Sequence, residues 1–214
     1  EQNVAVRSET GAQTQGFLQS ESDGNAASPH FRRAQALYKE GNLNAAIKQW
    51  DKALEVAPEN ADAYYHKGLA LEARGDLDQA VTQYREATRL KPTEVNFYVQ
   101  LARAYENAAD NVAALTTYQD ALILKPLSAH LHNRVGHLFA AEGKLKAAAD
   151  SWRQTILHQP DYAFAYVSLA NVLDETGEKV EALSLFKKAL SLDPRGPFAK
   201  EVRQKITRLQ TPSS

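Results

Sequence analysis

Residues 61–94 read ADAYYHKGLALEARGDLDQAVTQYREATRLKPTE, and the features of this stretch return at a fixed interval along the chain. Its proline belongs to a series with a step of 34 residues: Pro58, Pro92, Pro126, Pro160 and Pro194. Alanine keeps the same step at Ala46, Ala80, Ala114, Ala148 and Ala182. A large aromatic residue keeps it at Trp50, Tyr84, Tyr118, Trp152 and Phe186. A fixed period of this length indicates one supersecondary unit copied in tandem.

Each copy contains two segments of helical length. In the quoted stretch these segments are 61–74 and 77–90, and Gly75 and Asp76 separate them. Glycine favours the left-handed conformation that ends a helix, and aspartate favours the start of the next one. Pro92 closes the unit, because proline cannot continue a helix. The pattern predicts an all-α chain of helix-turn-helix repeats, an α-solenoid.

The period also divides the chain. A polar N-terminal tail over 1–26 has no sustained helical pattern, and we expect it to be flexible because it cannot bury enough apolar area to offset the entropy of ordering. A capping helix is expected over 197–210, followed by a short tail over 211–214. Between them we expect five tandem repeats, which cover 27–60, 61–94, 95–128, 129–162 and 163–196.

Small residues recur midway along the first segment of each repeat, at Ala34, Gly68, Ala102, Gly136 and Ala170. Small side chains let two antiparallel helices approach closely, and the recurring aromatic residues then fill the space beside them. Two positions depart from the pattern. Thr155 stands where other repeats carry alanine, and its hydroxyl is expected to bond to a carbonyl one turn earlier. The turn of the third repeat lacks glycine, so we expect Asn107 to take the strained conformation or the turn to change shape.

Composition excludes several classes of function. Lys and Arg total 25 and Asp and Glu total 26, so the net charge of -1 provides no overall attraction to nucleic acid. No apolar run approaches the length of about 18 residues that would predict a membrane span. The chain has no Cys, which excludes disulfides and thiolate chemistry. It also has no Met, so either a targeting segment was removed or the chain is shortened. This favours an exported or membrane-associated bacterial protein over a cytoplasmic one.

These residues resemble the tetratricopeptide repeat. Its pattern of an aromatic, Leu-Gly and Tyr on the first helix is similar to Tyr98, Leu101, Ala102 and Tyr105. Its later Ala, aromatic and Pro positions are matched by Ala114, Tyr118, Ala121 and Pro126. The resemblance covers 27–196. It implies a right-handed superhelix of helix pairs whose concave groove, lined by the first helices, binds a peptide segment or another protein. It names no single function.

The helical phase of the first segments assigns candidate groove residues. Apolar ends at Tyr65, Leu69, Phe164 and Val167 are expected to flank a polar, partly basic centre. The predicted partner-binding residues are Tyr65, His66, Leu69, Gln100, Arg103, Asn133, Arg134, His137, Phe164, Val167 and Asn171. Arginine suits a grip on carbonyls or a carboxylate, and aromatic residues and arginine are common interface anchors. The alternative is a solvated surface on which mixed residues are tolerated.

Tetratricopeptide co-chaperones grip a C-terminal carboxylate with a Lys/Asn, Asn, Lys/Arg set over three consecutive repeats. In none of the three registers does this chain reproduce that set; the first, for example, has Phe31 and Gln35, then His66, then Asn96 and Gln100. A chaperone-tail receptor of this type is therefore not expected.

Catalytic and metal chemistry is also not expected. The sequence contains no GxxxxGK phosphate loop, no nucleophile elbow and no HExxH pair. His130 and His137 lie about 10.5 Å apart along a helix, too far to share one ion, and His132 falls at an aromatic position expected to be buried. We therefore expect no enzyme, no cofactor and no metal.

The two ends of the chain leave open alternatives. Phe17 and Leu18 in the tail could dock in the chain's own groove as a tethered ligand. Cations in the last helix could bind phosphate or a membrane surface, against the simpler interpretation of a solvated cap. The predicted function is a non-catalytic adaptor that binds a protein or peptide in its groove for assembly of a larger complex. The alternative is a structural subunit that acts through its ends or convex face, and the oligomeric state stays open.

Overall fold

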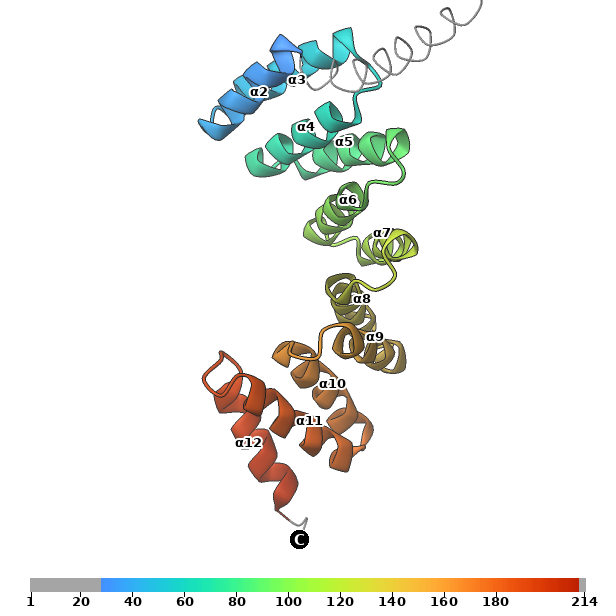
Figure 1. The fold of residues 1–214 in the computed structure, drawn as a ribbon, viewed down its shortest axis with the longest axis vertical. Helices are drawn as coiled ribbons and strands as arrows, with labels where there is room; N and C mark the ends of the chain where they lie inside the picture. Colours follow the sequence, from blue (N-terminus) through green and yellow to red (C-terminus); the bar gives the residue numbers. More distant parts are fainter. Residues whose placement is uncertain (1–27, 212–214) are drawn as a thin grey trace, which may run out of the picture. The chain divides into compact units, whose positions relative to one another are not determined.

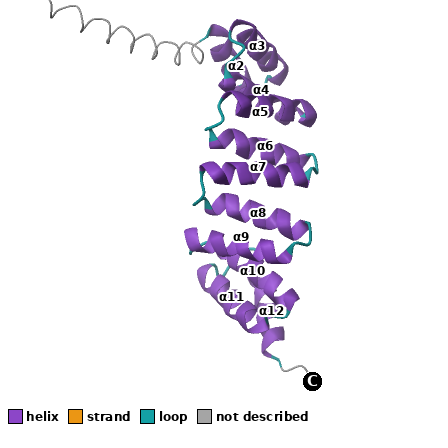
Figure 2. Cartoon of the chain, turned by 90° about the vertical axis from the view of Figure 1, so that its right-hand side faces the viewer, coloured by secondary structure: helices purple, strands orange, loops and turns teal. Residues whose placement is uncertain are grey.

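The computed structural model describes residues 28–211, and these form helices joined by short turns (Figures 1 and 2). The predicted class, an all-α chain of helix-turn-helix repeats, is confirmed, and no strand occurs within the described residues. The tail over 1–26, the proposed docking of Phe17 and Leu18 and nearly all of the tail over 211–214 lie outside the described residues.

The chain divides into two compact units that meet between Asp110 and Asn111. The helices of unit 1 are α2 (Pro29–Lys39), α3 (Leu43–Val56), α4 (Ala61–Arg74), α5 (Leu77–Leu90) and α6 (Val95–Asn107). The helices of unit 2 are α7 (Asn111–Leu124), α8 (Ala129–Ala141), α9 (Leu145–His158), α10 (Ala163–Thr176), α11 (Lys179–Leu192) and α12 (Ala199–Gln210).

Close helix crossings explain the small residues of the repeat. Gly68 of α4 lies so near the ring of Tyr84 of α5 that a Cβ on Gly68 would stand 2.6 Å from Tyr84 Cε1. In unit 2, a Cβ on Gly136 of α8 would stand 2.8 Å from Trp152 Nε1 of α9. Tyr84 and Trp152 are both buried. The expected pairing of a small residue with a large aromatic ring is therefore confirmed at these two crossings.

Turns between paired helices share one geometry, including the turn that lacks glycine. Gly75 has a φ of 96°, its N–H bonds Glu72 O, and the N–H of Asp76 bonds Leu71 O. In the third repeat Ala109 has a φ of 60° and its N–H bonds Glu106 O at 2.9 Å. The expectation that Asn107 would be strained, or that this turn would change shape, is wrong. The same hydrogen-bond pattern is kept, and Ala109 adopts the left-handed conformation that glycine adopts elsewhere.

Thr155 is fully buried in α9 and behaves as the sequence predicts. Its hydroxyl donates to Ser151 O one turn earlier at 3.1 Å. It also lies 3.4 Å from Ala129 O at the start of α8. The hydroxyl that threonine adds at this alanine position leaves no unsatisfied polar group, because it has an acceptor.

The last helix, α12, completes the core of unit 2. Val202 is fully buried, and Phe198, Ile206 and Leu209 are partly buried against the same cluster. Its polar residues reach α10: Lys205 Nζ donates to Asn171 Oδ1 at 2.6 Å, and Arg208 pairs with Asp174. Each of these pairs spans 34 residues, so α12 contacts α10 at the positions where the first helix of a further repeat would stand.

Candidate functional site: the first-helix faces

In unit 1 the first helices of the repeats, α2, α4 and α6, are connected by aromatic contacts. The ring centroids of Phe31 and His66 are 5.6 Å apart, and those of Tyr65 and Phe97 are 4.8 Å apart. The two contacts join α2 to α4 and α4 to α6. We call the surface made by Tyr65, His66, Leu69, Gln100 and Arg103 the first-helix face of unit 1.

His66 is the centre of an aromatic cluster. Its ring stacks on Trp50 with an interplanar angle of 9° and contacts Tyr65 edge-on at 5.2 Å. Burial lowers the pKa of His66 below its usual value of 6.5, and the nearby Asp62 carboxylate only partly opposes this effect. Because the neutral ring is favoured, His66 presents an aromatic and weakly polar surface at neutral pH.

Tyr65 joins the aromatic cluster to a polar pair on α6. It hydrogen-bonds Gln100, whose Oε1 accepts from Arg103 Nη1 at 3.2 Å. Burial raises the pKa of Tyr65, and the bond with Gln100 partly opposes the rise. Leu69 is half-buried and packs against the same core, whereas Arg103 is exposed. The structure therefore brings all five candidates of unit 1 onto adjoining helices, with apolar rings beside an accessible guanidinium.

Glu72 of α4 connects three helices of unit 1. Its Oε2 accepts from the Tyr84 hydroxyl of α5 at 2.8 Å, and its Oε1 accepts from Asn107 Nδ2 of α6 at 3.1 Å. Burial, followed by this carboxylate, raises the pKa of Tyr84 far above its usual value. Asn107, expected to relieve strain in a turn, instead fixes α6 against α4. The helices of unit 1 are thus held by polar contacts between repeats as well as by apolar packing.

In unit 2 the corresponding face is centred on His137 of α8. Its ring meets Trp152 of α9 edge-on at 5.3 Å and Phe164 of α10 at 5.5 Å. Phe164 is 41% exposed, which is unusual for a large aromatic residue in a packed repeat. Arg134, one turn before His137, is half-buried. His137, Phe164 and Arg134 make up the first-helix face of unit 2.

Three other candidate residues in unit 2 have little solvent-exposed surface. Asn133 and Val167 are each 6% exposed, and Asn133 Oδ1 has no hydrogen-bond partner among the described residues. Asn171 is half-buried and engaged by Lys205. Val167 belongs to a stretch of α10 that is buried from Ala165 to Ala170. Their role in partner binding stays a prediction.

The predicted polar centre falls in two units, with Gln100 and Arg103 in one and Asn133, Arg134 and His137 in the other.

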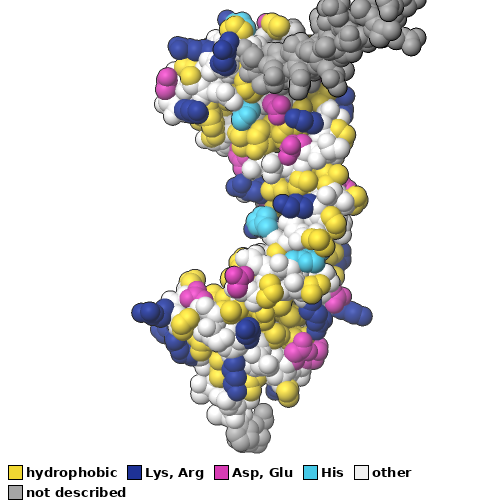
Figure 3. Space-filling view, in the orientation of Figure 1, with side chains coloured by type: hydrophobic (Ala, Val, Ile, Leu, Met, Phe, Trp, Pro, Cys, Tyr) yellow, Lys and Arg dark blue, Asp and Glu magenta, His cyan; other side chains and the backbone are white. Residues whose placement is uncertain are grey.

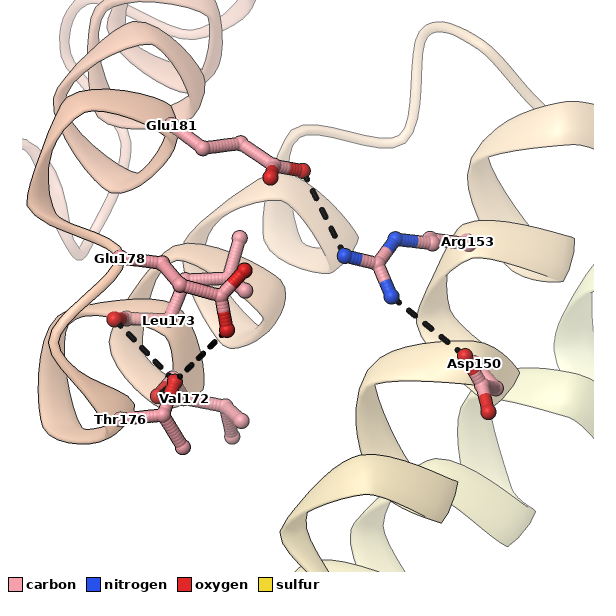
Figure 4. A network of polar contacts seen from close by, with 7 residues as sticks. All are labelled: Asp150, Arg153, Val172, Leu173, Thr176, Glu178 and Glu181. Carbon is pink, nitrogen blue, oxygen red and sulfur yellow. Dashed lines mark hydrogen bonds and ion pairs between the residues drawn. The ribbon is translucent and has the colours of Figure 1, made fainter.

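Sequence reasoning missed a hollow of about 340 Å³ on unit 2. Leu145, Ala149 and Arg153 of α9 and Val172 and Thr176 of α10 contribute to its lining. Arg153 pairs with Asp150 at 3.4 Å and with Glu181 of α11 at 3.5 Å (Figure 4). The residues come from neighbouring repeats, so no local motif marks them. The Arg153 guanidinium is already paired with two carboxylates, so we assign no binding role to the hollow.

His132 and His158 lie outside the two faces and contact each other. His132 is half-buried, not fully buried as expected; its Nε2 donates to Pro126 O at 2.8 Å, and its ring stacks with His158 at 5.7 Å. Tyr166 makes the equivalent bond to Pro160 O at 2.9 Å.

Within 28–211 no group of three or more His, Asp or Glu side chains is placed to hold a metal ion. In the same range no helix is both long and apolar enough to cross a bilayer.

Comparison with known proteins agrees with this geometry. The family model for the tetratricopeptide repeat matches residues 31–95 and 136–197, which is more than half of the chain. The chain therefore belongs to the tetratricopeptide repeat (TPR) family. No curated protein matches the chain.

Several solved structures share the fold. MamA is 23% identical with a TM-score of 0.70, and the match covers 78% of this chain and 96% of MamA. A MamA from Desulfovibrio magneticus RS-1 is 15% identical with a TM-score of 0.68, covering 78% and 95%. YrrB, a TPR protein with an unusual peptide-binding site, is 22% identical with a TM-score of 0.71, covering 88% and 97%. At these identities the likeness concerns the fold.

Proposed function

We propose that the protein is a non-catalytic adaptor that binds a segment of a partner protein on its first-helix faces. The observation that carries this proposal is the arrangement of Tyr65, Gln100 and Arg103, in which a half-buried aromatic ring lies beside an exposed guanidinium. Aromatic residues and arginine dominate interface energetics because they bury a large area and make directional hydrogen bonds. TPR folds, including that of YrrB with its peptide-binding site, support this role by analogy.

The first-helix face of unit 1 sets the chemistry of such a partner. The rings of Tyr65 and His66 with Leu69 provide apolar contact area, and Arg103 provides planar donors. Gln100 already holds the guanidinium, so less side-chain entropy is lost when Arg103 meets a ligand oxygen. The expected ligand is an extended segment with an apolar side chain next to a carboxylate or a free carbonyl. The phenyl ring of Phe164 offers a comparable apolar contact on unit 2.

A second candidate function is a structural subunit that assembles through its other faces. Ile123 of α7 and Leu157 of α9 occupy equivalent positions in consecutive repeats and are 79% and 66% exposed. Each lies nine residues after a buried alanine, Ala114 or Ala148, and is therefore on the opposite side of its helix. Leu127 is 71% exposed between α7 and α8. Exposed aliphatic residues of this kind are common in assembly surfaces.

Site-specific photo-cross-linking tests both functions in one experiment. A photoreactive side chain is placed at Leu69 or Phe164 on the first-helix faces, and at Leu157 as the matched position on the opposite side. Cross-linking of the same partner from Leu69 and Phe164, with loss of the Leu69 product after Arg103→Glu, supports the adaptor. Arg85→Glu changes an exposed arginine of α5 and is the control. Products formed only from Leu157, together with oligomers by light scattering, would contradict the adaptor and support the subunit.

A further inference from the structure

The C-terminal part of unit 2 carries a concentration of positive charge. Residues 184–210 contain seven Lys or Arg against two acidic residues, Asp193 and Glu201. The rest of the chain then has eighteen basic against twenty-four acidic residues, so the near-neutral total conceals an uneven distribution. Figure 3 shows dark blue Lys and Arg side chains gathered over this part of unit 2.

Four of the exposed cations lie on α11, on α12 and in the turn that joins these two packed helices: Lys187, Arg195, Lys200 and Arg203. Arg203 Nη2 donates to Pro194 O at 2.6 Å, which fixes its side chain beside Arg195. Lys200 occupies the repeat position of Tyr166, whose hydroxyl reaches the carbonyl of the equivalent proline, Pro160. Within 28–211, Lys187, Arg195 and Lys200 make no ion pair, so their charges are uncompensated. We call these four residues the terminal basic patch.

Repeat symmetry shows that the patch departs from the rest of the array. In unit 1, Asp51 of α3 and Lys67 of α4 form an ion pair at 2.7 Å. Four repeats later the same two positions are Lys187 of α11 and Arg203 of α12. The two positions that form an ion pair at the start of the array are therefore both positively charged at its end. Like charges on neighbouring helices repel each other, and an anion that binds both of them relieves the repulsion.

The surroundings of the patch favour a short ligand. Glu178 and Glu181 lie near the start of α11, about 9–14 Å along the helix from Lys187, so an extended anionic surface would also meet negative charge. Within 184–211 no large hydrophobic residue is exposed, because Val202, Ile206 and Leu209 of α12 face the core. The patch thus lacks both the apolar residues that enter a bilayer and the exposed aromatic residues that stack on bases.

We propose that the terminal basic patch is a second interaction surface, which binds a short acidic segment of a partner protein. Carboxylates of such a segment would lie between Lys187 and Arg203 and beside Arg195 and Lys200, forming charge-assisted hydrogen bonds. The ligand is held at the end of the array, so binding does not depend on the first-helix faces. The proposal is therefore independent of the adaptor function assigned to those faces.

The test uses the full chain and a fluorescently labelled oligoglutamate peptide, with affinity measured by anisotropy at low and at physiological salt. The patch variant combines Lys187→Gln, Arg195→Gln and Lys200→Gln, which leaves the bond between Arg203 and Pro194 intact. The matched control combines Lys48→Gln, Lys52→Gln and Arg85→Gln, three exposed cations of unit 1. We expect the patch variant to bind about tenfold more weakly, the control to bind as the wild type does, and the affinity to fall with salt.

Circular dichroism confirms that all variants remain folded. Absence of peptide binding at low salt, or equal weakening in the patch and control variants, would overturn the proposal. Tighter binding of phosphatidylserine vesicles or of single-stranded DNA than of the peptide, lost in the same patch variant, would also overturn it and assign the patch to that other ligand.

Discussion

Gly68 and Tyr84 are in direct contact across the α4–α5 crossing, and the aromatic ring occupies the space that a side chain at position 68 would need. The Cε1 atom of Tyr84 lies 2.6 Å from where a Cβ would stand, well inside van der Waals distance. Tyr84 cannot move aside easily, because it is fully buried and its hydroxyl is bonded to Glu72. This contact sets how closely the two helices approach.

Gly68→Ala is expected to destabilise unit 1 by about 1–3 kcal/mol, because the added methyl group forces the helices apart. Alanine is the better helix former by about 1 kcal/mol, so propensity alone predicts the opposite sign. Urea denaturation followed by circular dichroism measures the change. A stabilised Gly68→Ala variant would show that the crossing is not tightly packed.

Ala109→Gly is expected to stabilise the chain by about 1 kcal/mol, since glycine adopts a positive φ without the steric cost that alanine has. The φ of 60° at Ala109 is otherwise matched only at glycines among the described residues. Ala108→Gly is the control, because Ala108 has a φ of -83° and gains nothing from glycine. The melting temperatures of both variants are compared with that of the wild type, and a higher value for Ala108→Gly alone would contradict the prediction.

Stability is expected to depend on pH through His66. Its folded-state pKa is lowered by burial, so the unfolded chain takes up the proton first as the pH falls below 6.5. The stabilisation is therefore present above pH 6.5 and is lost as the pH falls through the folded-state pKa. His66→Gln should lose less stability than the wild type between neutral and acidic pH. An NMR titration in which His66 protonates at or above its usual pKa would contradict this account.

Tyr84→Phe is expected to cost about 1–2 kcal/mol at neutral pH, because it removes a donor from the largely covered Glu72 carboxylate. Burial and Glu72 raise the pKa of Tyr84, so the unfolded chain loses its phenolic proton first above pH 10. The stabilisation from a raised pKa is complete below that pH and is lost as the pH rises. The difference between wild type and variant should therefore shrink in alkali, as measured by denaturation at several pH values. A constant difference would exclude this linkage.

Periodicity made most of the fold predictable. Helix ends near Gly75 and Pro92, the glycine–aromatic crossings and the back-bond of Thr155 all follow from local chemistry repeated in register. Asn107 was misassigned because its role depends on Glu72, which is 35 residues away and belongs to another repeat. The conformation of a turn can be predicted from its own residues, whereas the role of a side chain that bridges two repeats cannot.

The candidate site was predictable to a lesser extent. Helical phase correctly put Tyr65, Gln100 and Arg103 together, because adjacent first helices lie side by side in unit 1. The same phase implied that Asn133 and Val167 were accessible, but they are nearly covered. Phase gives the direction of a side chain and not the depth to which neighbouring helices bury it. Partner binding by all eleven candidates stays a prediction.

The contacts of α12 have a consequence for how such genes change in length. Lys205 meets Asn171 and Arg208 meets Asp174, each partner one period away, as the first helix of any added repeat would. An unequal crossover that inserts or removes 34 codons before those of α10 leaves the residues of α10 and α12 that contact each other unchanged. The terminal helix is therefore compatible with longer and shorter relatives of the chain. The number of repeats can change while the same helix caps the last one.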